Sequence, residues 1–247
     1  MIAMKPNFGV LVNAYDTMRP RYPKQTIRLV RRSIKGKLPL VLDIGCGTGI
    51  STRQMAESGA TVIGADIDQR MLEAAMAHSE GNVAYVLSAA DKLPFRDHSF
   101  DAVTAFQALH WFSDRKSLKE LKRVLRMGGV LAVVQPKRDA NTMTGEIREL
   151  LRKRFPKNPA PTYFKQDLRD TLKSVGFKSV TVSTARKSER YTLNDYLVLL
   201  QSHSFWNQVP GGRKSSEIGF LRRYLRARLE NGYVYDRYAI TVFIAKR

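Results

Sequence analysis

The sequence predicts an α/β fold, a mostly parallel seven-stranded sheet with helices on both faces. Short apolar, β-branched segments alternate with amphipathic segments of helical length, which is the pattern of parallel strand–helix–strand units. The first of these strands runs directly into a glycine-rich turn, as strands do where a ligand lies beyond their carboxyl ends. The segments with strand character are 40–44, 61–65, 83–87, 100–106, 130–134, 178–184 and 238–245.

Helices are expected on either side of these strands. Apolar residues at helical spacing predict a first amphipathic helix with its basic residues outward, and they are Ile27, Val30, Ile34 and Leu38. Further helices are expected at 51–58, 71–77 and about 114–126. The last of these has Ser113 or Asp114 as its N-cap and is expected to stop at the Gly128-Gly129 pair.

The rhythm changes after Pro136. Helices are expected at 141–154, 166–175, 193–205 and 220–229, with proline and glycine breakers between them. We therefore expect residues 1–136 to form a ligand-binding core with an N-terminal lid helix. Residues 137–247 are expected to supply the remainder of the sheet, with a helical cap inserted at about 137–164 and 190–231.

The composition limits the class of protein. With 43% apolar residues in 247, the chain can bury a full core. No apolar run approaches the ~20 residues of a bilayer span, and the first ten residues lack the apolar stretch of a signal peptide. A soluble protein of the cytoplasm is expected. Cys46 is the only cysteine, so no intrachain disulfide forms, and no His and Cys cluster has zinc spacing. No metal is therefore expected.

The chain is strongly basic, with 42 Lys and Arg against 22 Asp and Glu and a formal charge of +20. Residues 19–37 contain eight bases and no acid, and residues 213–228 contain six bases beside Glu217 alone. Solvated helix faces explain such runs most simply. The alternative is an acidic substrate, a nucleic acid or an anionic surface, whose local concentration such a field raises.

The strongest signal is the segment 41–49, which reads VLDIGCGTG. Its glycines permit a sharp turn and a close approach of backbone to ligand. Asp43 precedes the turn, and Asp66 closes the next strand about twenty residues further on, where an acidic side chain binds ribose hydroxyls. A dinucleotide fingerprint would need a third glycine at the G-x-G-x-x-G spacing, but Ile50 stands there, so NAD is not expected.

These residues resemble motif I of the class I S-adenosylmethionine-dependent methyltransferases, whose usual form is D-x-G-x-G-x-G. The match is at Asp43, Gly45, Gly47 and Gly49, with Cys46 inside it. The resemblance continues through Asp66 and the elements LPF, SFD and LRMGG at 93–95, 99–101 and 125–129, in the manner of the small-molecule branch called type 11. It covers about residues 10–136 and implies a Rossmann-like fold.

The resemblance implies roles by position. The three glycines would line the methionine portion of S-adenosylmethionine, Asp43 would lie behind its amino group, and Asp66 would accept hydrogen bonds from the ribose. Ile67 would pack on the adenine. The family's usual acid before LPF is Ala89 here, which leaves the backbone of Ala90, with Asp91, to face the adenine edge. The product cofactor would be S-adenosylhomocysteine.

The acceptor side is expected after the fourth strand, at 106–112, which reads FQALHWF. Enzymes that methylate the exocyclic amino groups of bases usually have an [N/D/S]-P-P-[Y/F] motif at this point (the base-amine motif), and enzymes that methylate C5 of pyrimidines need a nucleophilic cysteine. Neither is present here. The segment is instead similar to that of trans-aconitate methyltransferase and related enzymes acting on small carboxylates or hydroxyls. Gln107 is expected to contact the cofactor. His110, whose ordinary pKa lies near 6.5, is a candidate general base. Trp111 is expected to face the substrate. The alternative is that His110 only forms a hydrogen bond with the pocket wall and that Trp111 packs under the cap.

The segment YDTMRPRYP at 15–23 also resembles the family, in which this stretch closes over the cofactor. Tyr15 and Arg19 would then contact the cofactor's carboxylate or the substrate, and Tyr22 the substrate. An ordinary helix cap is the alternative.

Three functions follow from the sequence. The first is a methyltransferase acting on a small-molecule carboxylate or hydroxyl. The second is an RNA or protein methyltransferase that uses the basic runs, which is less favoured because the base-amine motif and an appended RNA-binding module are absent. The third is a non-catalytic cofactor-binding protein.

Overall fold

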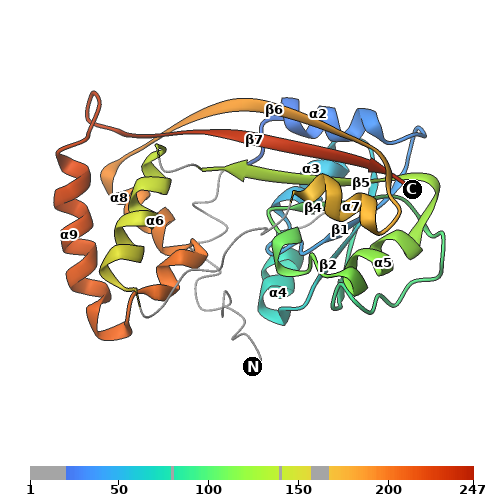
Figure 1. The fold of residues 1–247 in the computed structure, drawn as a ribbon, viewed down its shortest axis with the longest axis horizontal. Coiled ribbons are helices and arrows are strands. Elements are labelled where there is room, and N and C mark those ends of the chain that lie inside the picture. The colour runs from blue at the N-terminus through green and yellow to red at the C-terminus, as the bar shows by residue number, and fades with distance from the viewer. Residues whose placement is uncertain (1–20, 79–80, 139–140, 157–166) are drawn as a thin grey trace. The chain divides into compact units, whose positions relative to one another are not determined.

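The computed structural model describes residues 21–78, 81–138, 141–156 and 167–247 (Figure 1). Its centre is a seven-stranded sheet with the order β3-β2-β1-β4-β5-β7-β6. The strands are β1 (Leu40–Ile44), β2 (Thr61–Asp66), β3 (Val83–Leu87), β4 (Phe100–Phe106), β5 (Leu125–Lys137), β6 (Lys178–Tyr191) and β7 (Val234–Lys246). The predicted Rossmann-like sheet is confirmed.

A helix precedes β1, and helices connect β1 to β2, β2 to β3 and β4 to β5, whereas residues 88–99 between β3 and β4 contain none. The helices are α2 (Lys24–Ser33), α3 (Ile50–Glu57), α4 (Gln69–Ala77), α5 (Arg115–Val124), α6 (Met143–Arg154), α7 (Leu168–Ser174), α8 (Leu193–Gln201) and α9 (Lys214–Arg226), with short 3₁₀ turns η2 (Leu109–Trp111), η3 (Ser204–Gln208) and η4 (Gly211–Arg213). Asp114 caps α5 by accepting the Ser117 backbone N–H at 3.0 Å, as the sequence predicts for one of its two candidates.

The five adjacent strands β3, β2, β1, β4 and β5 are parallel, and their registers place their carboxyl ends at one edge of the sheet. Ile44 of β1 lies opposite Ala65 of β2, and Phe106 of β4 lies opposite Val134 of β5. The loops that follow β1, β2 and β4 therefore leave the same edge of the sheet, which is where ligands bind in open parallel sheets.

Helices cover both faces of the sheet. Successive side chains of a strand point to opposite faces of the sheet, so those of Leu42 and Asp43 of β1 lie on different faces. Leu42 packs in a core that includes Leu118 of α5 and Leu172 of α7. Asp43 on the other face accepts a hydrogen bond from Thr52 of α3. The central strands β1 and β4 are therefore buried between helices, which explains why they are almost continuously apolar.

The expected boundaries of four helices and three strands were wrong. Leu38 does not extend the apolar face of the first helix, because α2 ends at Ser33 and the Leu38 side chain is 63% exposed. α5 ends at Val124 rather than at the glycine pair, because the next residue, Leu125, is extended and pairs with Phe100 of β4. α8 ends at Gln201, with η3 continuing the segment, and α9 begins at Lys214, before the expected residue 220. β5, β6 and β7 are longer than expected, because β5 includes the exposed residues 126–128 ahead of its apolar run, and exposed polar residues inside β6 and β7 interrupt the apolar pattern.

The chain forms two compact units, and each has its own core. The sheet unit contains the described residues of 20–136, 163–185 and 240–247. The helical unit contains those of 137–162 and 186–239, so β6 and β7 contribute to both. Tyr196, Trp206 and Leu221 belong to the core of the helical unit. No helix in the described part of the chain has the length and apolar character that crossing a bilayer requires.

Candidate functional site

The glycine turn after β1 has the backbone conformation that its sequence predicts. Gly45, Gly47 and Gly49 have φ of 68°, 55° and 79°, in the left-handed region that glycine adopts without strain. A Cβ on Gly45 would collide with the Cβ of Ala108, in the segment after β4. A Cβ on Gly47 would meet nothing within 4 Å. The turn therefore packs against protein at Gly45 and is open at Gly47.

Asp66 is bonded directly to this turn. Its Oδ2 accepts the Gly47 backbone N–H at 2.8 Å, and its Oδ1 accepts the Asp68 N–H at 3.0 Å. Burial raises the pKa of the carboxyl, while these backbone donors oppose the shift. Each carboxylate oxygen has a further lone pair, so the side chain can still accept hydrogen bonds from a pair of hydroxyls. The structure thus brings Asp66 and the glycine turn together.

Asp43 is fully buried beneath the turn. Its Oδ2 accepts the hydroxyls of Ser51 at 2.8 Å and Thr52 at 2.7 Å, and its Oδ1 accepts that of Thr104 at 2.7 Å. Desolvation raises the pKa of Asp43, and the three hydroxyls partly offset that effect. The carboxylate therefore joins β1, the start of α3 and β4, and holds the turn above it in place.

Cys46 lies within the turn but is buried, at 6% exposure. Burial, followed by the charges of Asp43 and Asp66, raises the pKa of its thiol well above the ordinary value. The thiol therefore stays protonated at neutral pH and is a poor nucleophile.

Gln107 and Tyr22 meet at the carboxyl end of β4. The Gln107 Nε2 donates to the Tyr22 hydroxyl at 2.8 Å, and the Tyr22 ring packs on Phe106 with the ring centroids 4.8 Å apart. Gln107 has φ of 55°, in the left-handed region where residues other than glycine are strained. Such strain is concentrated at functional sites.

Gln54 fixes the backbone of Tyr22 and is a residue that the sequence did not indicate. Its Oε1 accepts the Tyr22 N–H at 2.9 Å, and its Nε2 donates to the Tyr22 carbonyl at 2.8 Å. The adjacent Arg21 forms an ion pair with Glu57, also on α3. No sequence signal links Gln54 to a residue 32 positions earlier, because the pairing exists only after α3 has packed beside Tyr22.

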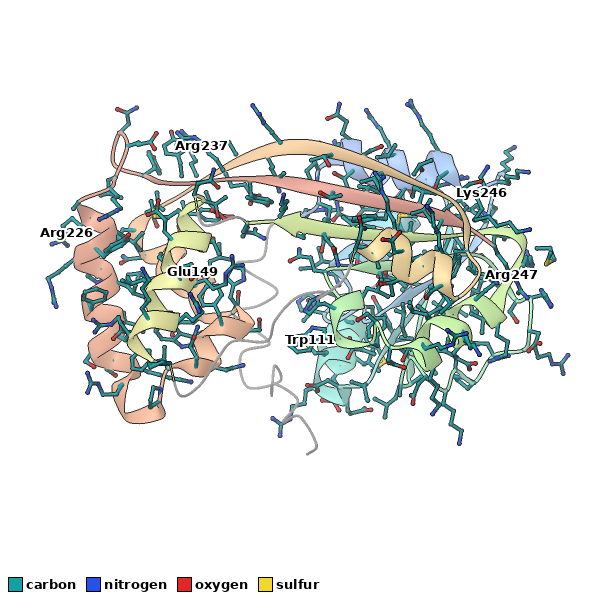
Figure 2. All side chains as sticks on the ribbon, viewed as in Figure 1. Trp111, Glu149, Arg226, Arg237, Lys246 and Arg247 are labelled. Atoms are coloured by element: carbon teal, nitrogen blue, oxygen red, sulfur yellow. The ribbon has the colours of Figure 1, made fainter. Side chains whose placement is uncertain are left out.

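His110 and Trp111 occupy η2, the turn that follows Gln107. Their ring centroids are 4.6 Å apart, and Trp111 is 41% exposed at the surface of the sheet unit (Figure 2). Leu109, between Gln107 and these rings, is fully buried and anchors the turn in the core. Leu109 therefore holds the rings of His110 and Trp111 close to Gln107, which directly follows β4.

The segment after β3 supplies the remaining described candidates. The Ser88 N–H donates to the Asp66 carbonyl at 2.9 Å, which places the start of this segment beside the end of β2. Ala90 is buried in the core, whereas Asp91 accepts a hydrogen bond from Lys116 of α5 at 2.9 Å, which holds the pKa of its carboxyl below the ordinary value. Ile67, directly after β2, is 51% exposed.

Two expected site residues, Tyr15 and Arg19, lie outside the described residues. In the part of the chain that the structure describes, no group of three His, Cys, Asp or Glu side chains could hold a metal ion. The described candidates therefore come from three strand ends, with Tyr22 added from the segment before α2.

An open glycine turn beside a strand-end carboxylate, at the carboxyl edge of a Rossmann-like sheet, is typical of proteins that bind a nucleoside-containing cofactor. A family model described as a methyltransferase domain matches residues 42–133. An uncharacterized methyltransferase of Mycobacterium tuberculosis is 37% identical over 147 residues, which are 60% of this chain and 58% of that protein. The match thus covers little more than half the length of that relative.

Two further similarities extend over more of the chain. An O-methyltransferase of Aspergillus nomiae is 31% identical over 169 residues, covering 66% of this chain and 73% of its own length. The structure of a putative type II methyltransferase from Anaeromyxobacter dehalogenans aligns with a TM-score of 0.66 and 22% identity over 92% of this chain and 97% of that one. The chain belongs to the type 11 family of class I S-adenosylmethionine-dependent methyltransferases.

Proposed function

We propose that this chain transfers the methyl group of S-adenosylmethionine to a small-molecule acceptor. The observation that carries the proposal is the bond between Asp66 and the Gly47 N–H, which joins an acidic strand end to an open left-handed glycine turn. When bound, the cofactor supplies an electrophilic methyl on a sulfonium, so the protein's task is mainly to hold donor and acceptor in line.

The residues present fit this cofactor. The space beside Gly47 is open, and the Thr48 hydroxyl, 1% exposed, has no hydrogen-bond partner among the described residues. A buried unpaired hydroxyl is costly, so a ligand polar group beside it would be favourable. Asp66 would accept the ribose hydroxyls, Gln107 would contact the cofactor, and the turn from Gly45 to Gly49 would line its methionine end.

The adenine side follows from the same arrangement. Ile67 offers an exposed apolar surface directly after Asp66, and the Ala90–Asp91 backbone lies in the segment that begins at Ser88 beside the end of β2. An exposed apolar side chain beside a polar rim is a suitable surface for a flat heterocycle. Asp43 and Cys46 would act from below, by keeping the turn rigid.

For the acceptor we propose an oxygen nucleophile, a carboxylate or hydroxyl, as in trans-aconitate methyltransferase-like members. The segment from Gln107 to Phe112 supports it, as does the similarity to the Aspergillus nomiae protein, which is an O-methyltransferase. Trp111 and Tyr22 would contact the acceptor. The basic surface would favour an acidic molecule, because a field of this sign concentrates anions.

His110 would act as the general base only for a hydroxyl acceptor, since a carboxylate has no proton to lose at neutral pH. His110→Asn should therefore lower kcat with hydroxyl acceptors and leave carboxylate acceptors nearly unaffected. Turnover of cofactor labelled in the methyl group, with a panel of both acceptor kinds, measures the difference. An equal loss with both kinds would assign His110 a structural role.

The binding step is tested by Asp66→Ala and isothermal titration with S-adenosylhomocysteine. We expect at least a ten-fold loss of affinity, because ribose hydroxyls lose their charged acceptor, worth about 1.5–3 kcal/mol. Asp170→Ala, which removes an exposed carboxylate of α7 away from the turn, is the control. Unchanged affinity in Asp66→Ala would sink the proposal, and binding without turnover on any acceptor would favour a non-catalytic cofactor-binding protein.

The second function, an RNA or protein methyltransferase, is supported only by the basic runs. It requires polyanion or protein binding that falls steeply with salt, because neutralising phosphates releases counterions. Transfer of label to RNA or to a basic or acidic protein in place of small molecules would favour it.

A further inference from the structure

One surface of the sheet unit combines positive charge with exposed apolar side chains. We call it the α2 surface, and it comprises Lys24, Arg28, Leu29, Arg32, Lys35, Lys37 and Leu38, all of which are exposed. Figure 2 shows nitrogen-tipped side chains extending from α2 away from the strands. No acidic residue occurs between Arg19 and Leu42, so the surface has no acid of its own.

The helix and the turn after it hold these side chains in place. Lys24, Arg28 and Arg32 are spaced four residues apart and so share one face of α2, while Ile27 and Val30 anchor the opposite face in the core. In the turn that follows, Arg31 donates to the carbonyls of Gly36 at 3.0 Å and Lys37 at 2.9 Å. These bonds hold the turn in one conformation, with its two lysines and Leu38 outward.

The five cations of the surface have no ion-pair partner among the described residues. Other basic residues are neutralised locally: Lys116 binds Asp91, Arg154 binds Glu217, and Arg237 binds Glu230. The cations of the α2 surface therefore present their full charge to whatever approaches it.

The exposed side chains of Leu29 and Leu38 favour one kind of anionic partner over another. They are 37% and 63% exposed beside the cations. A single-stranded nucleic acid would be recognised by aromatic side chains that stack on its bases, and residues 23–40 contain none. A bilayer with anionic headgroups would bind both the basic and the apolar side chains of this surface, because the cations contact lipid phosphates and the leucines enter the acyl boundary.

We propose that the α2 surface docks this protein on an anionic lipid bilayer. Five cations lie within the range of four to eight that marks binding to acidic lipid surfaces. α2 begins two residues after Tyr22, whose hydroxyl accepts a hydrogen bond from Gln107, and the turn that follows α2 leads to the amino end of β1, so the α2 surface extends from beside the candidate site toward the opposite edge of the sheet. The inference does not depend on which acceptor is methylated.

The test is co-sedimentation of the full chain with vesicles. We expect binding to vesicles of about 30% phosphatidylglycerol in phosphatidylcholine, little binding to phosphatidylcholine alone, and release at about 0.5 M salt, where screening is strong. The triple variant Lys24→Gln, Arg28→Gln, Arg32→Gln should bind about 100-fold more weakly, since each cation near such a surface contributes roughly five-fold. Leu38→Ser alone should weaken binding about five-fold.

A matched control removes three exposed cations elsewhere: Arg115→Gln, Lys119→Gln, Arg226→Gln. This variant should retain vesicle binding within about two-fold, although its net charge falls equally. All variants should keep the thermal transition and the S-adenosylhomocysteine affinity of the unaltered chain, which separates this inference from the proposed function.

Three outcomes would overturn the proposal. The first is no retention on the anionic vesicles at low salt. The second is an equal loss in the control triple variant, which would show that net charge alone is responsible. The third is displacement from vesicles by single-stranded RNA at a matched phosphate concentration, together with loss of RNA binding in the α2 triple variant, which would make nucleic acid the partner.

Discussion

Single residues show how the candidate site is held. The carboxamide of Gln54 uses both its oxygen and its nitrogen on the backbone of Tyr22, and the Tyr22 hydroxyl in turn accepts a hydrogen bond from Gln107. Gln54 is 6% exposed, so water cannot easily replace it. It is therefore a positioning residue for the rim of the site.

Gln54→Met should lower the free energy of unfolding by about 2 kcal/mol, because it leaves an N–H and a carbonyl of Tyr22 without their partner. It should also weaken S-adenosylhomocysteine binding. Urea unfolding and isothermal titration measure the two effects. Gln69→Met, on the exposed surface of α4, is the control and should change neither. Equal stability of the two variants would contradict the role given to Gln54.

Gly45 and Gly59 provide a matched pair of left-handed glycines. Their φ values are 68° and 89°, but only at Gly45 would a Cβ collide with a neighbour, Ala108. Gly59→Ala should cost about 1 kcal/mol from backbone strain alone. Gly45→Ala should cost a further 1–3 kcal/mol, roughly, from overpacking and should impair cofactor binding. Chemical denaturation of both variants checks the order, and a larger loss in Gly59→Ala would refute it.

At the scale of elements, α5 is fastened to the segment before β4 by a charged network. Arg123 donates to Glu120 at 2.8 Å, to Asp97 at 2.6 Å and to the carbonyl of Phe95 at 2.8 Å, while Glu120 accepts the Leu93 N–H at 2.8 Å. The hydrogen bond with Arg123 holds the pKa of Glu120 below its ordinary value. The LPF element thus has a structural contact in addition to any cofactor role.

This network predicts a pH dependence. Because the folded-state pKa of Glu120 is depressed, its contribution to stability is present above the unfolded pKa of about 4.3 and is lost as pH falls through the folded value. Glu120→Gln should lower Tm at pH 7, and the gap from the unaltered chain should narrow below about pH 4.3. Thermal unfolding between about pH 7 and pH 3 measures it. Glu73→Gln, on exposed α4, should show no such gap, and a gap that widened in acid would exclude the network.

At the scale of the whole molecule, two compact units each have a core, and the helical unit contains a buried charge. Glu217 of α9 is 1% exposed and accepts from Arg154 of α6 through two bonds, at 2.7 and 3.1 Å. The Arg154 guanidinium also lies over the Phe220 ring, 4.1 Å from its centroid. This pair joins the two longest helices of the unit.

Arg154→Met should destabilise the helical unit by about 3–5 kcal/mol, because it leaves the carboxylate of Glu217 buried without a counter-charge. Hydrogen exchange should then accelerate in α6 and α9 more than in β1 and β4. Arg152→Met, at an exposed neighbouring position, should alter exchange little. Uniform acceleration through both units would show that they do not unfold separately.

Features whose signals are local could be predicted from the amino-acid sequence alone. Alternating strands and helices indicated the parallel sheet, and the glycines at 45, 47 and 49 indicated a left-handed turn, because only glycine takes that conformation without strain. The parallel order also implied that Asp66 and the turn share one edge, which the Asp66–Gly47 bond shows directly.

Contacts between residues far apart in the sequence became known from the folded chain. The hydroxyl of Thr104, 61 residues from Asp43, and the carboxamide of Gln54, 32 residues from Tyr22, could not be assigned from the sequence, since neither contact follows from spacing. The exposure of Leu38 and the last residue of α5 also depend on tertiary packing. Leu125 is extended because it pairs with Phe100 of β4, and Leu38 is exposed because α2 ends before it. Local conformational preference acts between neighbours, whereas a contact between distant residues exists only once the chain has folded.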